Sequence, residues 1–243
     1  MSNVTLDEVP DRPALEAADA GPPPAPGPLG ASKEAPPGPP EAGPAPSLRG
    51  ARDFWLVWSG QSVSLLGDGL YGIAMAWWIT QTLGSATALA GYALCWFIPT
   101  VTLPFVAGSL IDRANRKALI ALMDGLQGIA VTVLALLLAT GRLELWHVYV
   151  GAVVLASCGA IHGPALDSSI PNLVPAAALS RANGLYATSG SVANSAGPLL
   201  GGTLVGFAGL PVAMVLNALS FWFATGATLL ARIPSPRVCR RAR

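Results

Sequence analysis

Residues 54–79 read FWLVWSGQSVSLLGDGLYGIAMAWWI and open the longest nearly uncharged segment of the chain. From Phe54 to Ile111, a run of 58 residues, the only charged side chain is Asp68. A helix needs about 20 apolar residues to cross a bilayer, so this segment is long enough for two crossings. The polar break TQTLGSAT at 80–87 predicts one span at 54–79 and a second at 86–110.

Four further apolar runs follow, each bounded by charged or turn-forming residues. The boundaries are the DRANRK cluster at 112–117, Gly141 with Arg142, the polar segment after Pro164, and GFAGLP at 206–211. The expected spans lie at 118–140, 145–165, 182–207 and 211–231. The sequence therefore predicts an all-α membrane protein with six transmembrane helices.

The distribution of basic residues supports the even number of spans. Lys and Arg close to spans collect on the cytoplasmic side of a membrane. With six spans, Arg142 stands alone on one side, and the other side holds Arg49, Arg52, Arg113, Arg116, Lys117, Arg181, Arg232, Arg237, Arg240, Arg241 and Arg243. Both ends of the chain are accordingly expected in the cytoplasm.

Composition divides the chain into three parts. It is 52% hydrophobic and 11% charged, far from the soluble average of about 25% charged. Residues 1–50 differ, because they hold 13 of the 22 prolines and 10 of the 27 charged side chains. We expect a disordered cytoplasmic tail over 1–50, the six-span bundle over 51–232 and a basic cytoplasmic tail over 233–243. No secretory signal precedes the first span, so that span should direct insertion.

Several classes of function receive no support from the residues. The net charge is +1, without a basic block away from the ends, which argues against nucleic-acid binding. The chain has three cysteines, Cys95, Cys158 and Cys239. Because the first two lie in apolar runs, they are expected to be buried as small apolar side chains. His147 and His162 have no acidic or Cys partner at metal-ligand spacing, and no HExxH or GxSxG occurs. No catalytic residue, metal or cofactor is expected.

The loop after the second expected span reads GSLIDRANRK, residues 108–117. Its order of residues resembles the signature of the major facilitator superfamily between the second and third spans, carried here by Gly108, Asp112, Arg113, Arg116 and Lys117. The resemblance implies a gating latch that breaks and reforms as a transporter alternates its access. An ordinary basic cytoplasmic turn is the alternative.

Each position in this loop has a physical interpretation. Gly108 would allow close helix contact, and Asp112 would interact with the positive end of a neighbouring helix or pair with a nearby Arg. The basic residues would hold a short turn at the membrane surface. Asn115 stands where the family often has Gly, and Asn tolerates left-handed backbone next best after Gly, so a left-handed turn is expected to survive.

A second motif lies in the fifth expected span, where NSAGPLLGG covers 194–202. It is similar to the antiporter motif of drug and proton exchangers of the same superfamily, through Asn194, Gly197, Pro198, Gly201 and Gly202. The proline would free a backbone carbonyl near Asn194 and bend the helix, while the glycines would strip one face of side chains. The alternative is a general small-residue helix interface.

Three longer segments extend the resemblance over residues 52–232. They are FWLVWSGQSVSLLGDGL at 54–70, GPALDSSIPNLVP at 163–175 and SRANGLY at 180–186, and they look like drug and siderophore exporters of the macrolide-efflux type. The resemblance implies the N-terminal six-span half of a cell-membrane exporter that exchanges an amphipathic small molecule (a drug, macrolide or siderophore-like compound) for protons. Such a half would need a second six-span half, from another chain or a second copy. A truncated, non-transporting membrane subunit is the alternative function.

Asp68 is the candidate for proton coupling, as the only ionisable group of the first two spans. Its competing roles are to cap a neighbouring helix near the outer surface or to bind Arg142. Asp124 lies seven residues after Lys117, so it is expected to stay near the cytoplasmic face and pair with the basic turn.

Five side chains are candidates for lining a substrate cavity. Polar groups facing lipid are costly, and aromatic rings suit amphipathic ligands. The candidates are Gln61, Trp96, Phe97, Asn217 and Trp222. Lipid-facing or core packing is the alternative for the aromatic members.

Overall fold

The computed structural model describes residues 48 and 50–233, without the side chains of residues 106, 109, 110, 112 and 113. Almost all of the expected N-terminal tail and of the basic C-terminal tail therefore lies outside the described residues. Leu48, three residues before the expected start of the bundle, is already buried in a cluster with Phe54 and Ile170.

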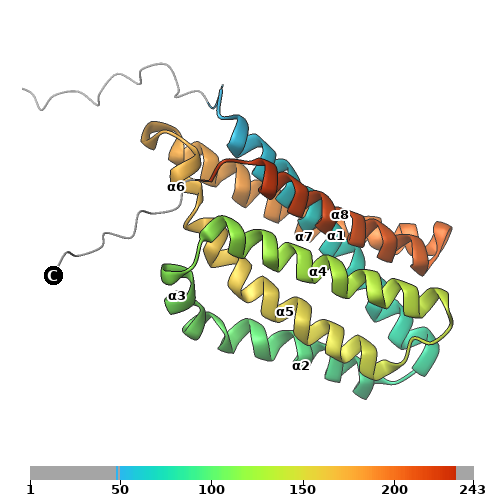
Figure 1. Ribbon diagram of the computed structural model, residues 1–243. Coiled ribbons are helices and arrows are strands. Elements are labelled where there is room, and N and C mark those ends of the chain that lie inside the picture. The colour runs from blue at the N-terminus through green and yellow to red at the C-terminus, as the bar shows by residue number, and fades with distance from the viewer. Residues whose placement is uncertain (1–47, 49, 234–243) are drawn as a thin grey trace, which may run out of the picture. The chain divides into compact units, whose positions relative to one another are not determined.

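Helices make up the described part of the chain, and no strand occurs in it (Figure 1). They are α1 (Arg52–Leu83), α2 (Ala86–Thr102), α3 (Pro104–Arg113), α4 (Arg116–Ala139), α5 (Leu145–Asp167), α6 (Ile170–Leu173), a 3-10 turn η1 (Ala176–Ala178), α7 (Leu179–Ala208) and α8 (Leu210–Leu230). Five of the six expected spans each match a single helix, to within four residues at either end.

The expected second span is the exception, because two helices, α2 and α3, occupy it. The break falls at Leu103, directly before Pro104. Proline has no N–H and cannot donate to the carbonyl four residues earlier, so one rung of the helix is lost. The ribbon changes direction between α2 and α3 (Figure 1).

Two tight connections depend on glycine. Gly84 ends α1 with φ 58 and ψ 18, the left-handed conformation that a helix end often adopts. Gly209 alone joins α7 to α8 and has φ 83 and ψ 164, a conformation open to glycine and strained for other residues. The tight turn expected at Gly209 is confirmed.

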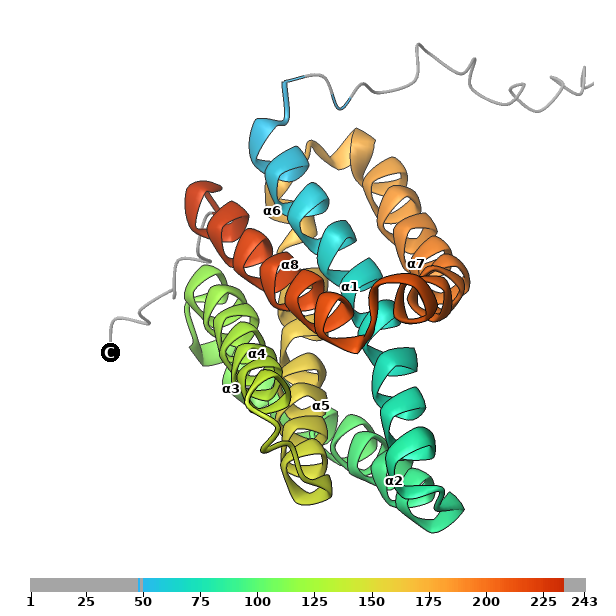
Figure 2. The same cartoon turned by 90° about the vertical axis from the view of Figure 1, so that its right-hand side faces the viewer.

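Packing joins helices that lie far apart in the sequence. The first helix, α1, packs against both α7 and α8, and α8 packs in turn against α4. On the other side, α5 lies against α4, α2 and α3. Figure 2 shows α1 between α7 and α8, with α4 and α5 adjoining.

The helices place almost all basic residues of the described part at one end of the bundle. We call this the basic end; it contains Arg52, Arg113, Arg116, Lys117 and Arg181, at the starts or ends of their helices, and Arg232, two residues after α8. Arg142 lies in the turn between α4 and α5, at the opposite end. The described chain enters and leaves at the basic end, as an even number of crossings requires (Figure 1).

Three helices, α4, α5 and α8, are each long and apolar enough to span a bilayer. The apolar α2 has 17 residues and reaches full span length only together with α3. At 32 and 30 residues, α1 and α7 are long enough but more polar. Large apolar side chains point outward, with Phe105 86% and Phe207 93% exposed. The chain is thus a membrane protein whose six crossings form one helical bundle.

Candidate functional site

A line of polar side chains follows the inner face of α1. Gln61 and Ser64 are buried, and Asp68 is half-buried at the middle of the helix. Residues three, four and seven apart on a helix share one face, so this line runs along the side that faces the bundle. Tyr71 continues the line and is fully buried.

Asp124 of α4 contacts polar side chains of two other helices, α1 and α5. Its side chain is 1% exposed, and Gln61 Nε2 of α1 donates a hydrogen bond to its Oδ2 at 2.9 Å. On the other side, Nε2 of His162 in α5 lies 3.1 Å from Asp124 Oδ1. A nearly buried carboxylate requires such partners because its desolvation is costly.

The expectation that Asp124 pairs with the basic turn is wrong, because helix geometry carries it away. Asp124 is eight residues into α4, or about 12 Å along the axis, and it faces the bundle. The basic residues bond to main-chain carbonyls instead. Arg116 donates from Nη1 to Ser168 O at 2.7 Å, and Lys117 Nζ donates to Leu229 O at 2.7 Å.

These two bonds place positive charge at the carboxyl ends of two helices. Ser168 is the residue after α5, and Leu229 belongs to the last turn of α8. Helix carboxyl ends carry partial negative charge and unpaired carbonyls, which cations stabilise. The start of α4 is therefore connected to the ends of α5 and α8 at the basic end.

Two other positions of the GSLIDRANRK loop differ from expectation. Gly108 is exposed, and a side chain there would meet none of the described atoms within 4 Å, so Gly108 mediates no close helix contact in the part of the chain that the structure describes. Asn115 has φ −71 and ψ 107, an extended conformation, since it caps α4 by accepting a hydrogen bond from Ala118 N. The side chains of Asp112 and Arg113 lie outside the described residues.

Asp68 has a polar neighbourhood formed by α1, α2 and α8. Asn217 is fully buried next to it, and its Nδ2 has no hydrogen-bond partner among the described residues. Within the same part of the chain, the buried hydroxyls of Tyr71 and Tyr92 also have no hydrogen-bond partner. No ion pair joins Asp68 to Arg142 among the described residues. Buried polar atoms are nearly always paired, so these three mark a place where polar groups gather.

The motif in α7 divides between two faces of the helix. Gly197 and Gly201, four residues apart, pack against Gly69 and Leu70 of α1. The other three members, Asn194, Pro198 and Gly202, are exposed or half-buried. The helix continues through Pro198 without interruption. The motif thus includes a close-packing seam between α1 and α7, as the alternative interpretation requires.

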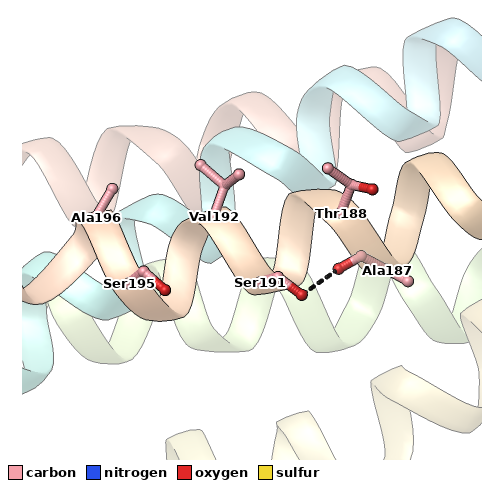
Figure 3. A pocket seen from close by; sticks show the side chains of 6 residues that line it. All are labelled: Ala187, Thr188, Ser191, Val192, Ser195 and Ala196. Atoms are coloured by element: carbon pink, nitrogen blue, oxygen red, sulfur yellow. Dashed lines mark hydrogen bonds between the residues drawn. The ribbon is translucent and has the colours of Figure 1, made fainter.

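An open groove runs along the outward side of α7, with a volume of about 580 Å³. Six residues line it, and all belong to this one helix, as Figure 3 shows: Ala187, Thr188, Ser191, Val192, Ser195 and Ala196. Ser191 Oγ donates to Ala187 O at 3.0 Å within the helix. A small, hydroxyl-rich face suits helix packing or water better than lipid.

The five cavity candidates do not come together in the bundle. Gln61 binds Asp124, and Asn217 is buried against α1. Trp96 packs partly buried against the core. Phe97 is 64% exposed, and Trp222 is 44% exposed with its Nε1 donating to Thr132 Oγ1.

His147 has a local structural role. It belongs to a capping box with Glu144 at the start of α5, where Glu144 N donates to His147 Nδ1 at 3.1 Å. No group of three or more His, Cys, Asp or Glu side chains able to hold a metal ion occurs in the described part of the chain.

Comparison with known proteins decides the family. Residues 57–241 match the sequence profile of the Major Facilitator Superfamily, which covers more than half of the chain. The chain belongs to the major facilitator superfamily. This agrees with a bundle of six crossings, since facilitator folds are built from six-helix halves.

Its relatives in the superfamily include named efflux proteins. Macrolide efflux protein A of Streptococcus pyogenes is 27% identical over 181 residues, which are 74% of this chain and 45% of that protein. Multidrug efflux pump Tap of Mycobacterium tuberculosis is 29% identical over 173 residues, or 69% of this chain and 41% of that one. The chain thus spans less than half the length of these relatives.

A solved facilitator structure shares the fold. It is the bacterial homolog of the human lysosomal transporter Spinster, in an inward-facing, unoccupied conformation. The TM-score is 0.58 at 18% identity, with 78% of this chain and 44% of that one covered. The expected half-facilitator architecture is confirmed.

Sequence reasoning missed the contact between Asp124 and His162. Both residues lie inside apolar runs, where an ionisable group needs a partner. The unfavourable burial of an unpaired charge indicates that each residue needs a partner. It does not identify the partner, because 38 residues separate the two positions and no helical spacing connects them.

Proposed function

We propose that this chain forms one six-span half of a proton-coupled exporter of amphipathic small molecules, drug-like or macrolide-like. The observation that carries the proposal is the match to macrolide and multidrug efflux proteins, which extends over 74% and 69% of the chain. Efflux is a property of those relatives and is extended here to this chain. Cytoplasmic placement of the basic end belongs to the same proposal, following the preference of Lys and Arg for that side.

We infer assembly with a second six-span half, supplied by another chain or a second copy. The α7 groove supports this, because one helix forms its whole described lining and leaves its other side open. Exposed Asn194 and Ser195 on that helix add polar groups that lipid would not satisfy. A partner bundle would supply the missing wall and enclose a path for the substrate.

Asp68 is the proposed coupling residue. It lies at the middle of α1, which we expect near the centre of the bilayer, and next to Asn217, whose Nδ2 has no hydrogen-bond partner among the described residues. A carboxyl group at that depth can take up a proton and lose its charge, or release the proton to a watered path. Proton movement and helix rearrangement would then be linked at one position.

The test measures macrolide accumulation in inverted membrane vesicles that contain only this chain. We expect uptake that depends on an acidic interior, stops with an uncoupler, and falls at least tenfold in Asp68→Asn. Asp53→Asn, in the first turn of the same helix, is the matched control and should retain uptake. Absence of uptake together with a monomeric mass in detergent would refute an exporter assembled from copies of this chain alone and favour a non-transporting subunit.

A further inference from the structure

A carboxylate and an imidazole face each other inside the bundle, apart from the proposed coupling residue. Asp124 is 1% exposed and His162 is 12% exposed, with 3.1 Å between Oδ1 and Nε2. The imidazole Nε2 is buried and has no aligned hydrogen bond to any side chain or main-chain group that the structure describes. Gln61 Nε2 donates a hydrogen bond to the other oxygen of the Asp124 carboxylate, Oδ2.

We propose that Asp124 and His162 form a second proton-binding site, at which His162 takes up one proton from water and becomes an imidazolium paired with Asp124. No bond other than the N–H bond forms or breaks, and release returns the proton to water. Use of this site in transport rests on the proposed function.

The charges of the pair favour this reaction. An ionised carboxylate with almost no exposure needs a nearby positive charge or several hydrogen bonds, and Gln61 supplies one bond. An imidazolium at 3.1 Å would supply the charge. The His162 side chain is 12% exposed at the surface of the bundle, whereas that of Asp124 is 1% exposed. Histidine is also the side chain that most readily changes charge near neutral pH.

Other titratable groups surround the pair on several elements. Asp68 of α1, Asp167 at the end of α5 and Tyr186 of α7 lie close enough for their charges to act on it. The packed helix α8 carries no titratable residue. Asp112 and Arg113 end α3, and their side chains lie outside the described residues. Asp124 is the group in direct contact with the imidazole, so its charge should dominate.

The site is placed to act on α1. Gln61 and Asp68 are seven residues apart, two turns or about 10 Å on one face of that helix. A proton on His162 changes how strongly Asp124 holds Gln61, because the carboxylate then shares its charge with a cation. The two proposed proton sites, Asp68 and the pair Asp124–His162, would thus act on α1 at two positions along its axis.

Histidine-selective nitrogen NMR of the full chain in lipid nanodiscs tests this site directly. The chain has two histidines, so His147→Gln leaves His162 as the only signal. We expect its ring nitrogens to change reversibly from neutral to protonated as the pH is lowered. Asp124→Asn in this background should weaken proton binding at least tenfold. Asp53→Asn, a carboxylate in the first turn of α1 that lies outside this cluster, is the control and should change it less than threefold.

The outcomes separate this inference from the proposed exporter, since the titration requires no flux. An Asp124→Asn protein that titrates within twofold of its parent overturns the proton site, even if macrolide uptake is present. Proton binding by His162 that is tenfold weaker in Asp124→Asn supports the site, even if macrolide uptake is absent. If Asp124→Asn does not fold, the His147→Gln protein alone still tests the proposal. A His162 imidazole that stays neutral down to pH 5 in that protein refutes it.

Discussion

Gly69 of α1 and Gly197 of α7 lie in backbone contact, so that neither position has room for a side chain. A Cβ built on Gly197 would stand 2.8 Å from the Cα of Gly69, and one built on Gly69 would stand 2.7 Å from the Cα of Gly197. Main-chain atoms cannot move aside as a flexible side chain does. The spacing between the two helices is therefore set by these glycines.

Replacement of Gly197 should separate the two helices. Gly197→Ala is expected to lower the free energy of unfolding by about 1–3 kcal/mol, because the added methyl group overpacks a backbone contact. Gly202→Ala is the matched control, since nothing lies within 4 Å of its Cβ position. The control should be neutral or stabilising, as Ala favours helices by about 1 kcal/mol over Gly. Equal effects in denaturant titrations of the two purified variants would contradict the glycine seam.

Loss of the Gln61 amide should destabilise the bundle through Asp124. Gln61→Leu leaves one oxygen of a buried carboxylate without its hydrogen bond, at a cost of about 1–3 kcal/mol. Gln81→Leu, exposed at the far end of the same helix, makes the identical chemical change and should cost almost nothing. Thermal unfolding in detergent compares them, and a Gln61→Leu protein as stable as Gln81→Leu would count against the network.

Arg116 should act as a cap for α5. Arg116→Ala removes the bond to Ser168 O from a partly buried site and should cost about 1–2 kcal/mol of unfolding free energy. Arg142→Ala, exposed at the opposite end, also removes one Arg and serves as control. High salt should reduce the difference only slightly, since the bond is partly shielded from water. A difference that disappears in salt would mean a surface charge effect.

The topology of the bundle predicts opposite locations for two reporter fusions. A reporter in the turn at 141–144 should be periplasmic or extracellular, while one at the carboxyl end should be cytoplasmic, because Lys and Arg gather at the basic end. Phosphatase and fluorescent-protein fusions measure the two locations. Both reporters in one compartment would exclude the six-crossing arrangement.

The positions of the helices followed from the sequence to within a few residues. Gly209 and Arg142 mark places where a chain must leave the bilayer, and each lies between two helices. The charged cluster at 112–117 marks a third such place and spans the break between α3 and α4. The division of the second span did not follow, although Pro104 was visible. A proline in an apolar run either bends a helix or ends it, and the sequence does not show which; in the structure the separate helix α3 packs against α5.

Partners of single side chains were the hardest to predict. The sequence placed Asp124 beside Lys117 because they are near in the chain, whereas the structure pairs it with residues 63 and 38 positions away. Gly197 and Gly202 are alike within their motif, yet one touches α1 and the other does not. The direction in which each faces depends on the rotation of α7 against α1.

The sequence by itself determined the class of the protein, the number of crossings and the family, because the bilayer excludes charge and forces apolar runs of fixed length into helices. Tertiary structure alone decided which polar side chains meet inside the bundle. Contacts such as Gln61 with Asp124 arise from how three helices rotate and approach one another, and helix rotation is set by packing over the whole interface.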